Sequence, residues 1–177
     1  DSLSKDLYGI LGVSIYSEGK ESIEEVIVQL GKEKNKTIST AESCTGGLVG
    51  HRLTEVPGSS DVYKGGLVVY SKESKIEMAG VGKGTLEVHG AVSAETAESM
   101  AYNVKNKFVS DYGISVTGIA GPTGGTKEKP VGLVYIGLAK NDSVKVKEFR
   151  FGNNRKRNKL RSSQVALNWL RLSLLND

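Results

Sequence analysis

Cysteine and histidine are scarce in this sequence, and their scarcity excludes several kinds of site. The 177 residues include one cysteine, Cys44, and two histidines, His51 and His89. A lone thiol cannot form an internal disulfide, and such cysteine usage favours the reducing cytoplasm. A dedicated zinc site relies on several Cys, His or carboxylate ligands, and this inventory is too small for one. We therefore expect a cytoplasmic protein that holds no metal.

Long hydrophobic runs are also missing. No uninterrupted apolar stretch approaches the roughly 18 residues that a membrane-spanning helix needs, so no membrane association is expected. The N-terminus lacks the basic region and apolar stretch of a secretion signal. The chain begins at Asp1 rather than at methionine, which suggests a processed or excised fragment.

Positive charge is mild overall and concentrated in one segment. The formal net charge is +4, and residues 155–161 carry five cations in seven positions. Such a segment is typical of a solvated helix start, with contact to an anionic small molecule as the alternative. Aromatic residues make up 6% of the chain and none lies among these cations, so we expect no nucleic-acid partner.

The first 36 residues differ from the remainder. Ser22 and Glu25 have the spacing of a capping box, and the apolar positions after them predict a helix that stops at Gly31. We assign residues 1–36 to a linker or to the tail of a preceding domain. Residues 37–177 form the second unit. A chain of this length can bury roughly 70% of its unfolded surface, which is enough for one folded domain.

Strands and helices alternate from Thr37 onward. The apolar run Gly66–Tyr70 predicts a buried central strand, and Ser71 and Ser93 are placed to cap the helices that follow. A final helix is expected over 154–175, with Leu160, Leu167, Leu170 and Leu174 on one side. Further strands are predicted at 37–40, 114–117, 131–138 and 144–151. This order predicts an α/β fold, a layered α/β/α domain with a central mixed sheet.

The stretch Thr40–Gly47, which reads TAESCTGG, carries the strongest functional signal. It follows a strand pattern and precedes a helical one. Small residues at such a turn let backbone amides approach a ligand, and the partial positive charge of these amides stabilises an anion or an oxyanion. Ser43 and Cys44 beside them indicate nucleophilic chemistry. Either residue is a candidate nucleophile, and Cys44 is equally compatible with a small packing role.

A serine nucleophile needs a nearby base. His51 is expected to point away from the site, and nothing marks His89 as catalytic. Lys75 is the alternative, although a lysine of ordinary pKa near 10.4 is about 99.9% protonated at pH 7. Burial and the dipole of the helix that Ser71 caps would both lower that pKa, whereas an exposed surface lysine is the competing interpretation. Tyr70 either donates a hydrogen bond to a substrate or is a core residue whose hydroxyl reaches solvent.

A second glycine-rich segment covers residues 117–126. It follows a predicted strand, so it belongs at a carboxyl end, where open α/β sheets bind ligands. It matches neither the P-loop pattern nor the dinucleotide-binding pattern. It either shapes a small-molecule pocket or serves as a flexible connection.

Six short motifs occur in a distinctive order along the chain. They are Thr40–Gly47, Val56–Ser60, Tyr70–Ser71, His89–Ser93, Gly118–Pro122 and Lys129–Gly132. Together they closely resemble the CinA C-terminal domain family, which includes the PncC-type nicotinamide mononucleotide deamidases. The resemblance covers about residues 37–177.

The resemblance implies an enzyme of pyridine nucleotide recycling. The reaction would be hydrolysis of the carboxamide of nicotinamide mononucleotide to nicotinic acid mononucleotide and ammonia, without a metal or another cofactor. The family's serine–lysine pair falls on Ser43 and Lys75, and its active-site tyrosine falls on Tyr70. A homodimer is also implied. The alternative is a non-catalytic nucleotide-binding or regulatory module of a two-part protein.

Substrate contacts are expected in both glycine-rich segments and at the start of the last helix. The expected binding residues are Thr45, Gly46, Gly47, Gly118, Ala120, Gly121 and Arg155, with the amides of Thr45 and Gly46 as oxyanion donors. Two positions depart from the family pattern. Lys72 replaces a common asparagine, and it would lower the pKa of Lys75 only if it pointed inward. Lys159 replaces an arginine, so it would contact a phosphate as a point charge rather than as a fork.

Overall fold

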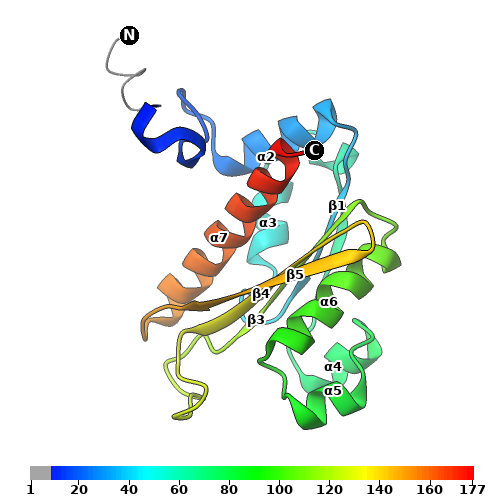
Figure 1. The fold of residues 1–177 in the computed structure, drawn as a ribbon, viewed down its shortest axis with the longest axis vertical. Helices are drawn as coiled ribbons and strands as arrows, with labels where there is room; N and C mark the ends of the chain where they lie inside the picture. The colour runs from blue at the N-terminus through cyan, green and yellow to red at the C-terminus, as the bar shows by residue number, and fades with distance from the viewer. Residues whose placement is uncertain (1–8) are drawn as a thin grey trace.

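The computed structural model describes residues 9–177, which form a five-stranded mixed sheet with helices on both faces (Figure 1). The strands are β1 (Ile38–Glu42), β2 (Tyr63–Val68), β3 (Tyr112–Gly118), β4 (Leu133–Lys140) and β5 (Ser143–Arg150). Their order is β2-β1-β3-β4-β5. Strand β1 pairs in parallel with β2 and β3, whereas the pairs β3–β4 and β4–β5 are antiparallel.

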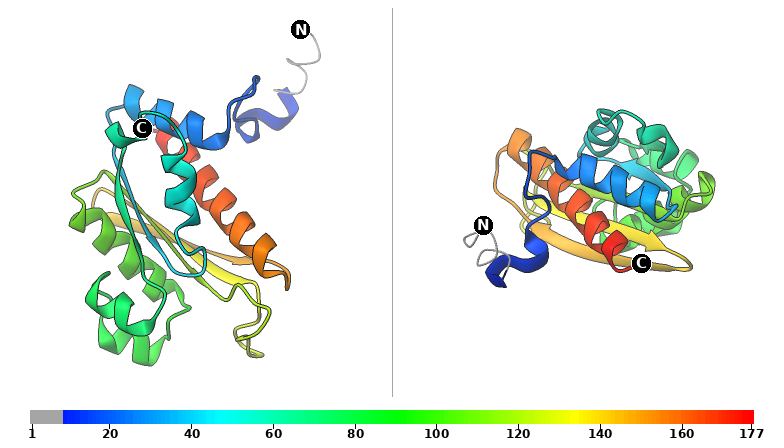
Figure 2. Two further views of the ribbon diagram at one scale, coloured as in Figure 1. Left: turned by 180° about the vertical axis from the view of Figure 1, so that it is seen from behind. Right: turned by 90° about the horizontal axis from the view of Figure 1, so that it is seen from above.

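The helices divide between the two faces of the sheet (Figure 2). The α-helices are α2 (Ile23–Glu33), α3 (Leu48–Thr54), α4 (Lys72–Glu77), α5 (Lys83–Val88), α6 (Ala94–Lys107) and α7 (Arg155–Leu175), and the short 3₁₀ helices are η1 (Gly12–Ser14) and η2 (Ser59–Asp61). Helices α2, α3 and α7 pack together on one face, and α4, α5 and α6 lie on the other. The predicted layered α/β/α fold is confirmed.

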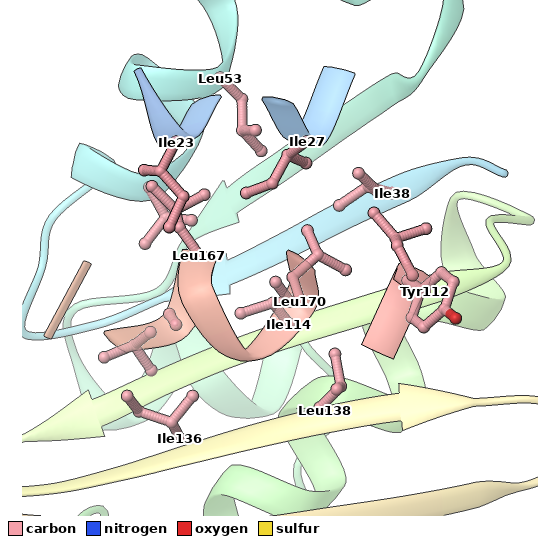
Figure 3. Close-up of a cluster of buried hydrophobic side chains, with 14 of the residues drawn as sticks. Ile23, Ile27, Ile38, Leu53, Tyr112, Ile114, Ile136, Leu138, Leu167 and Leu170 are labelled. Carbon is pink, nitrogen blue, oxygen red and sulfur yellow. The ribbon is translucent and has the colours of Figure 1, made fainter. Parts of the chain in front are cut away.

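The larger core cluster fills the space between the sheet and the α2, α3 and α7 layer (Figure 3). Ile23 and Ile27 of α2 meet Leu167 and Leu170 of α7 over the apolar residues of β1, β3 and β4. Helix α2 belongs to the segment that we assigned to a linker or preceding domain, and its apolar face packs in this core. Residues 1–8 of that segment lie outside the described residues.

Three local predictions need correction. The run Gly66–Tyr70 is not a central strand, because β2 is at an edge of the sheet and its side chains alternate, with Val68 57% exposed. Helix α2 does not stop at Gly31, which lies inside it against Val62, where a Cβ would come within 2.5 Å of a valine methyl. Leu160 does not join the buried leucines of α7 and is 56% exposed.

The predicted helix starts are confirmed. Ser71 accepts a hydrogen bond from the amide of Ser74, and Ser93 accepts one from the amide of Thr96. These caps fix where α4 and α6 begin, because each side chain satisfies an amide that has no partner within its helix.

Candidate active site

Three parallel strands end at one edge of the sheet, and the candidate residues follow them. Ser43 comes directly after β1, Tyr70 comes two residues after β2, and Gly118 is the last residue of β3. The amide of Ser43 donates to the carbonyl of Val116 at 2.8 Å, so Ser43 is held against β3. The topology therefore assembles these residues at the carboxyl edge, where α/β sheets bind ligands.

The turn between β1 and α3 depends on glycine and on a buried carboxylate. Gly46 and Gly47 have φ values of +61° and +90°, a left-handed conformation that glycine adopts without strain. The carboxylate of Glu42 is buried and accepts hydrogen bonds from the amides of Val49 at 3.0 Å and Gly50 at 2.8 Å. These bonds tie the first turn of α3 to the end of β1, so the turn that carries Ser43 has a fixed shape.

The amine of Lys75 lies within hydrogen-bond distance of the Ser43 hydroxyl. Nζ of Lys75 donates to Oγ of Ser43 at 2.9 Å and to the carbonyl oxygen of Val69 at 2.8 Å. The Lys75 side chain is only 2% exposed, although it extends from the short helix α4. The structure thus brings together the two side chains that the sequence indicated as nucleophile and base.

Burial is the main influence on the charge of Lys75. Removing the ammonium group from water lowers the pKa of Lys75 below its ordinary value. Lys72 lies three residues earlier and is exposed, so it points outward and is not placed to lower the pKa of Lys75. The electrostatic effect on Lys75 therefore comes from desolvation rather than from a second cation.

Cys44 does not have the properties of a reactive thiol. It is 5% exposed, and burial, together with the nearby carboxylate of Glu42, raises the pKa of Cys44 to about 12. The thiolate is the nucleophilic form of cysteine, and a thiol with this pKa stays protonated at neutral pH. Of the two adjacent candidates, Ser43 is the one whose side chain contacts the amine of Lys75.

A pocket of about 150 Å³ opens over the Ser43–Lys75 pair. It is lined by Ser43, Cys44, Tyr70, Lys75, Ala91, Val92, Thr117, Gly118, Ala120 and Arg155. The hydroxyl of Tyr70 accepts a hydrogen bond from Nη2 of Arg155 at 2.7 Å. Nη1 of the same arginine donates to the carbonyl of Gly121 at 3.0 Å. Arg155 therefore joins the end of β2 to the second glycine-rich segment.

The amides of the turn are not equally available. The amide of Gly46 donates to the carbonyl of Ser43 at 3.0 Å, so the structure does not support Gly46 as an oxyanion donor. The amide of Thr45 has no hydrogen-bond partner within residues 9–177, and its buried hydroxyl has none there either. Of the predicted binding residues, Thr45, Gly46, Gly47 and Gly121 do not line the pocket, whereas Gly118, Ala120 and Arg155 do.

A second, cationic pocket lies beside the first. It has a volume of about 520 Å³ and is lined by Leu48, Arg155, Lys156, Lys159 and Leu160. Arg155 lines both pockets. Nζ of Lys159 lies 3.5 Å from the position that a Cβ on Gly46 would occupy, so this ammonium group sits over the Ser43 turn. The larger pocket therefore offers positive charge next to the Ser43–Lys75 pair.

Sequence reasoning missed the turn at residues 89–92 as part of the site. Ala91 and Val92 line the pocket, and Thr117 Oγ1 donates to the carbonyl of Ala91 at 2.6 Å. Lys129 Nζ donates to the carbonyls of His89 at 2.6 Å and Val92 at 2.7 Å. The only indication in the sequence was that this turn and Lys129 fall in two of the six motifs that resemble the CinA C-terminal domain family. Neither histidine of the chain lines the pocket.

No metal centre is evident in the part of the chain that the structure describes. Within residues 9–177, no three His, Cys, Asp or Glu side chains are grouped so that they could hold a metal ion. Over the same range, no helix has both the length and the apolar character that a membrane crossing requires.

The fold and the site define an α/β domain with a buried serine–lysine pair at the carboxyl edge of its sheet. The family model described as the CinA C-terminal domain matches residues 20–174, and the chain belongs to this family. It is 47% identical over 173 residues to a CinA-like protein of Kosmotoga olearia, which covers 98% of this chain and 42% of that protein. It is 49% identical over 166 residues to a protein of Caldicellulosiruptor bescii named as competence-damage inducible, covering 94% of this chain and 40% of the relative. The chain thus spans about two fifths of the length of these relatives.

Solved structures agree with this assignment. The competence/damage inducible protein CihA from Agrobacterium tumefaciens superposes with a TM-score of 0.83 at 40% identity, covering 89% of this chain and 98% of that one. A CinA superfamily protein from Klebsiella pneumoniae superposes with a TM-score of 0.82 at 26% identity, covering 89% of this chain and all of that one (100%).

Proposed function

We propose that this domain hydrolyses the carboxamide of nicotinamide mononucleotide to nicotinic acid mononucleotide and ammonia. The observation that carries the proposal is the 2.9 Å contact between the buried amine of Lys75 and the hydroxyl of Ser43. A buried amine whose pKa is lowered can act as a base near neutral pH, and a serine hydroxyl requires such a partner to attack an amide. Membership of the CinA C-terminal domain family supports the same reaction.

The first half of the reaction forms an acyl-enzyme. The uncharged amine of Lys75 accepts the proton of the Ser43 hydroxyl while Oγ attacks the carboxamide carbon. The oxyanion that forms requires backbone donors at the turn after Ser43. The amides of Cys44 and Thr45 have no partner within residues 9–177, and of these two residues Cys44 lines the pocket. The Lys75 ammonium then protonates the departing nitrogen, the carbon–nitrogen bond breaks, and ammonia leaves.

The second half consumes one water molecule. Lys75, neutral again, accepts a proton from water, and the resulting hydroxide attacks the ester carbon. The ester bond breaks and the proton returns from Lys75 to Oγ of Ser43. The product leaves as a carboxylate after its acid group loses the remaining proton of the water to solvent. One water is consumed and one ammonia released for each nucleotide, with no oxidation or reduction.

The sizes of the two pockets fit the two ends of this substrate. Pockets for drug-sized ligands usually measure about 300–1,000 Å³, and the pocket at Ser43 has only about 150 Å³. It suits the pyridine ring alone. The adjoining pocket of about 520 Å³ carries the cations Arg155, Lys156 and Lys159, which suit the phosphate.

Ammonia release from nicotinamide mononucleotide tests the proposal directly. The unmodified protein should release ammonia, and Ser43→Ala should release none while still binding the nucleotide in a calorimeter. Cys44→Ala is the matched control, because its thiol is adjacent in sequence but protonated, and it should retain activity. Binding without hydrolysis by the unmodified protein would instead indicate a nucleotide-binding module.

A further inference from the structure

Arg155 connects the two pockets in a way that binding alone does not require. Its guanidinium forms part of the wall of both the small pocket at Ser43 and the larger cationic pocket. One of its nitrogens donates to the Tyr70 hydroxyl at 2.7 Å and another donates to the carbonyl of Gly121 at 3.0 Å. The group that is best placed to bind a phosphate is therefore already bonded to a tyrosine of the reactive pocket.

We propose that a phosphate in the larger pocket draws Arg155 away from Tyr70 and so makes the tyrosine oxygen available to the carboxamide. This inference rests on the proposed function. It makes Arg155 a specificity-determining residue, because a substrate without the phosphate leaves the Arg155–Tyr70 bond in place.

The chemistry of the two bonds favours this exchange. A guanidinium fork forms two parallel charge-assisted bonds with a phosphate, whereas it forms one bond with the neutral oxygen of Tyr70. Tyr70 is 57% exposed, so its bond to Arg155 competes with water and is readily broken. Lys156 and Lys159 in the same pocket add further attraction for the phosphate.

The released oxygen of Tyr70 has a specific use. A carboxamide has N–H groups that can donate to a phenol oxygen, whereas a carboxylate has none. While Arg155 donates to that oxygen, the amide of the substrate must compete for the same acceptor. Release of Tyr70 therefore favours binding of the amide substrate over binding of the acid product.

Linkage between the two contacts gives a test that does not depend on catalysis. If phosphate binding must break the Arg155–Tyr70 bond, removing the tyrosine hydroxyl must tighten phosphate binding by the free energy of that bond. The probe is ribose 5-phosphate, titrated calorimetrically into the unmodified protein and into variants. Tyr70→Phe should bind it about fivefold more tightly, the factor expected for one ordinary hydrogen bond. Arg155→Met should bind it at least about tenfold more weakly, as loss of a charge-assisted contact predicts.

The control is Lys145→Gln, which removes a cation from the separate groove between β5 and α7. It should bind the probe as the unmodified protein does. Equal affinity of Tyr70→Phe and the unmodified protein overturns the proposal, and so does unchanged affinity of Arg155→Met. Circular dichroism of each variant establishes that it is folded.

Kinetics then separate this inference from the proposed function. Nicotinamide riboside lacks the phosphate, and adding inorganic phosphate should raise its kcat/KM with the unmodified protein but not with Arg155→Met, chiefly through a lower KM. Arg155→Met alone should have a kcat/KM for the riboside about fivefold higher than that of the unmodified protein, since its Tyr70 is no longer occupied. Failure to hydrolyse nicotinamide mononucleotide would refute the proposed function only, and the calorimetric result would still decide the coupling. Hydrolysis of the mononucleotide with no effect of phosphate on the riboside would refute the coupling only.

Discussion

Replacement of Lys75 by methionine should abolish catalysis and at the same time change how stability depends on pH. Methionine keeps most of the apolar stem and removes the amine that contacts Ser43 at 2.9 Å. Loss of a positioned base costs about 10²–10⁴-fold in rate, so kcat for ammonia release should fall by at least that range. Lys75→Arg should be equally inactive, because a guanidinium does not lose its proton at any workable pH.

The effect on stability follows from the lowered pKa of Lys75. The unfolded chain binds this proton with an ordinary lysine pKa of about 10.4, and the folded protein releases it at lower pH because the side chain is buried. Between the two values the unfolded state binds more protons than the folded state. The free energy of unfolding therefore rises with pH across this window, by at most about 1.36 kcal/mol per pH unit, and Lys75 adds no pH dependence below or above it.

Chemical denaturation between about pH 7 and pH 11 measures this contribution. Many other lysines and tyrosines titrate in the same range, so the informative quantity is the difference between the unmodified protein and Lys75→Met. Lys72→Met is the matched control, because Lys72 lies on the same helix but is exposed, and its curve should run parallel to that of the unmodified protein. The ammonia-release rate of the unmodified protein should rise with pH over the lower part of the same window.

Two results would refute the reasoning. Parallel stability curves for the unmodified protein and Lys75→Met would mean that burial does not lower the pKa of the amine. Retention of more than a tenth of the activity by Lys75→Met would mean that another group accepts the Ser43 proton.

Three further predictions concern the turn that carries Ser43 and the residues on either side of it. Cys44→Ala should keep most of the activity. In the unmodified protein, Cys44 should react slowly with iodoacetamide at pH 8, because its pKa of about 12 keeps the thiol protonated. Rapid alkylation of Cys44 would contradict the raised pKa. Glu42→Gln should lower the free energy of unfolding by about 1–3 kcal/mol, since one of the two amides at the start of α3 then faces an NH₂ group. A denaturation midpoint equal to that of the unmodified protein would count against the capping role of Glu42. Gly50→Ala should destabilise the protein by about 1–3 kcal/mol, because the new Cβ would lie 2.6 Å from the hydroxyl of Tyr63. The control is Gly84→Ala in α5, whose Cβ would meet nothing within 4 Å and which should be neutral or stabilising. Similar unfolding free energies for the two alanine variants would argue against the close contact at Gly50.

Features that depend on a few neighbouring residues could be predicted from the sequence. The starts of α4 and α6 follow from Ser71 and Ser93, because a capping side chain bonds to an amide two or three residues later. The alternation of strands and helices also gave the layered fold. Both signals are local, so they need no knowledge of the tertiary structure.

Features that depend on packing between distant segments could not be predicted in the same way. The run Gly66–Tyr70 is apolar enough for a central strand, and only the order of strands in the sheet reveals that β2 is at an edge. The sequence offered Lys75 as a base, but its burial and its contact with Ser43, 32 residues earlier, are tertiary facts. Availability of the Gly46 amide depends on the shape of one turn, which residue types do not determine.

The position of Arg155 at the very beginning of α7 has a consequence for heat resistance. Its bond to Tyr70 joins segments 85 residues apart, yet the firm anchor of the helix begins only at Asn158, which is buried and donates to the carbonyls of Ala120 and Gly152. The exposed residues ahead of that anchor can fray without opening the core, and such local opening costs less free energy than global unfolding. On warming, the guanidinium should leave the site while the sheet is still intact, so affinity for a phosphate-bearing ligand should be lost at a lower temperature than the fold.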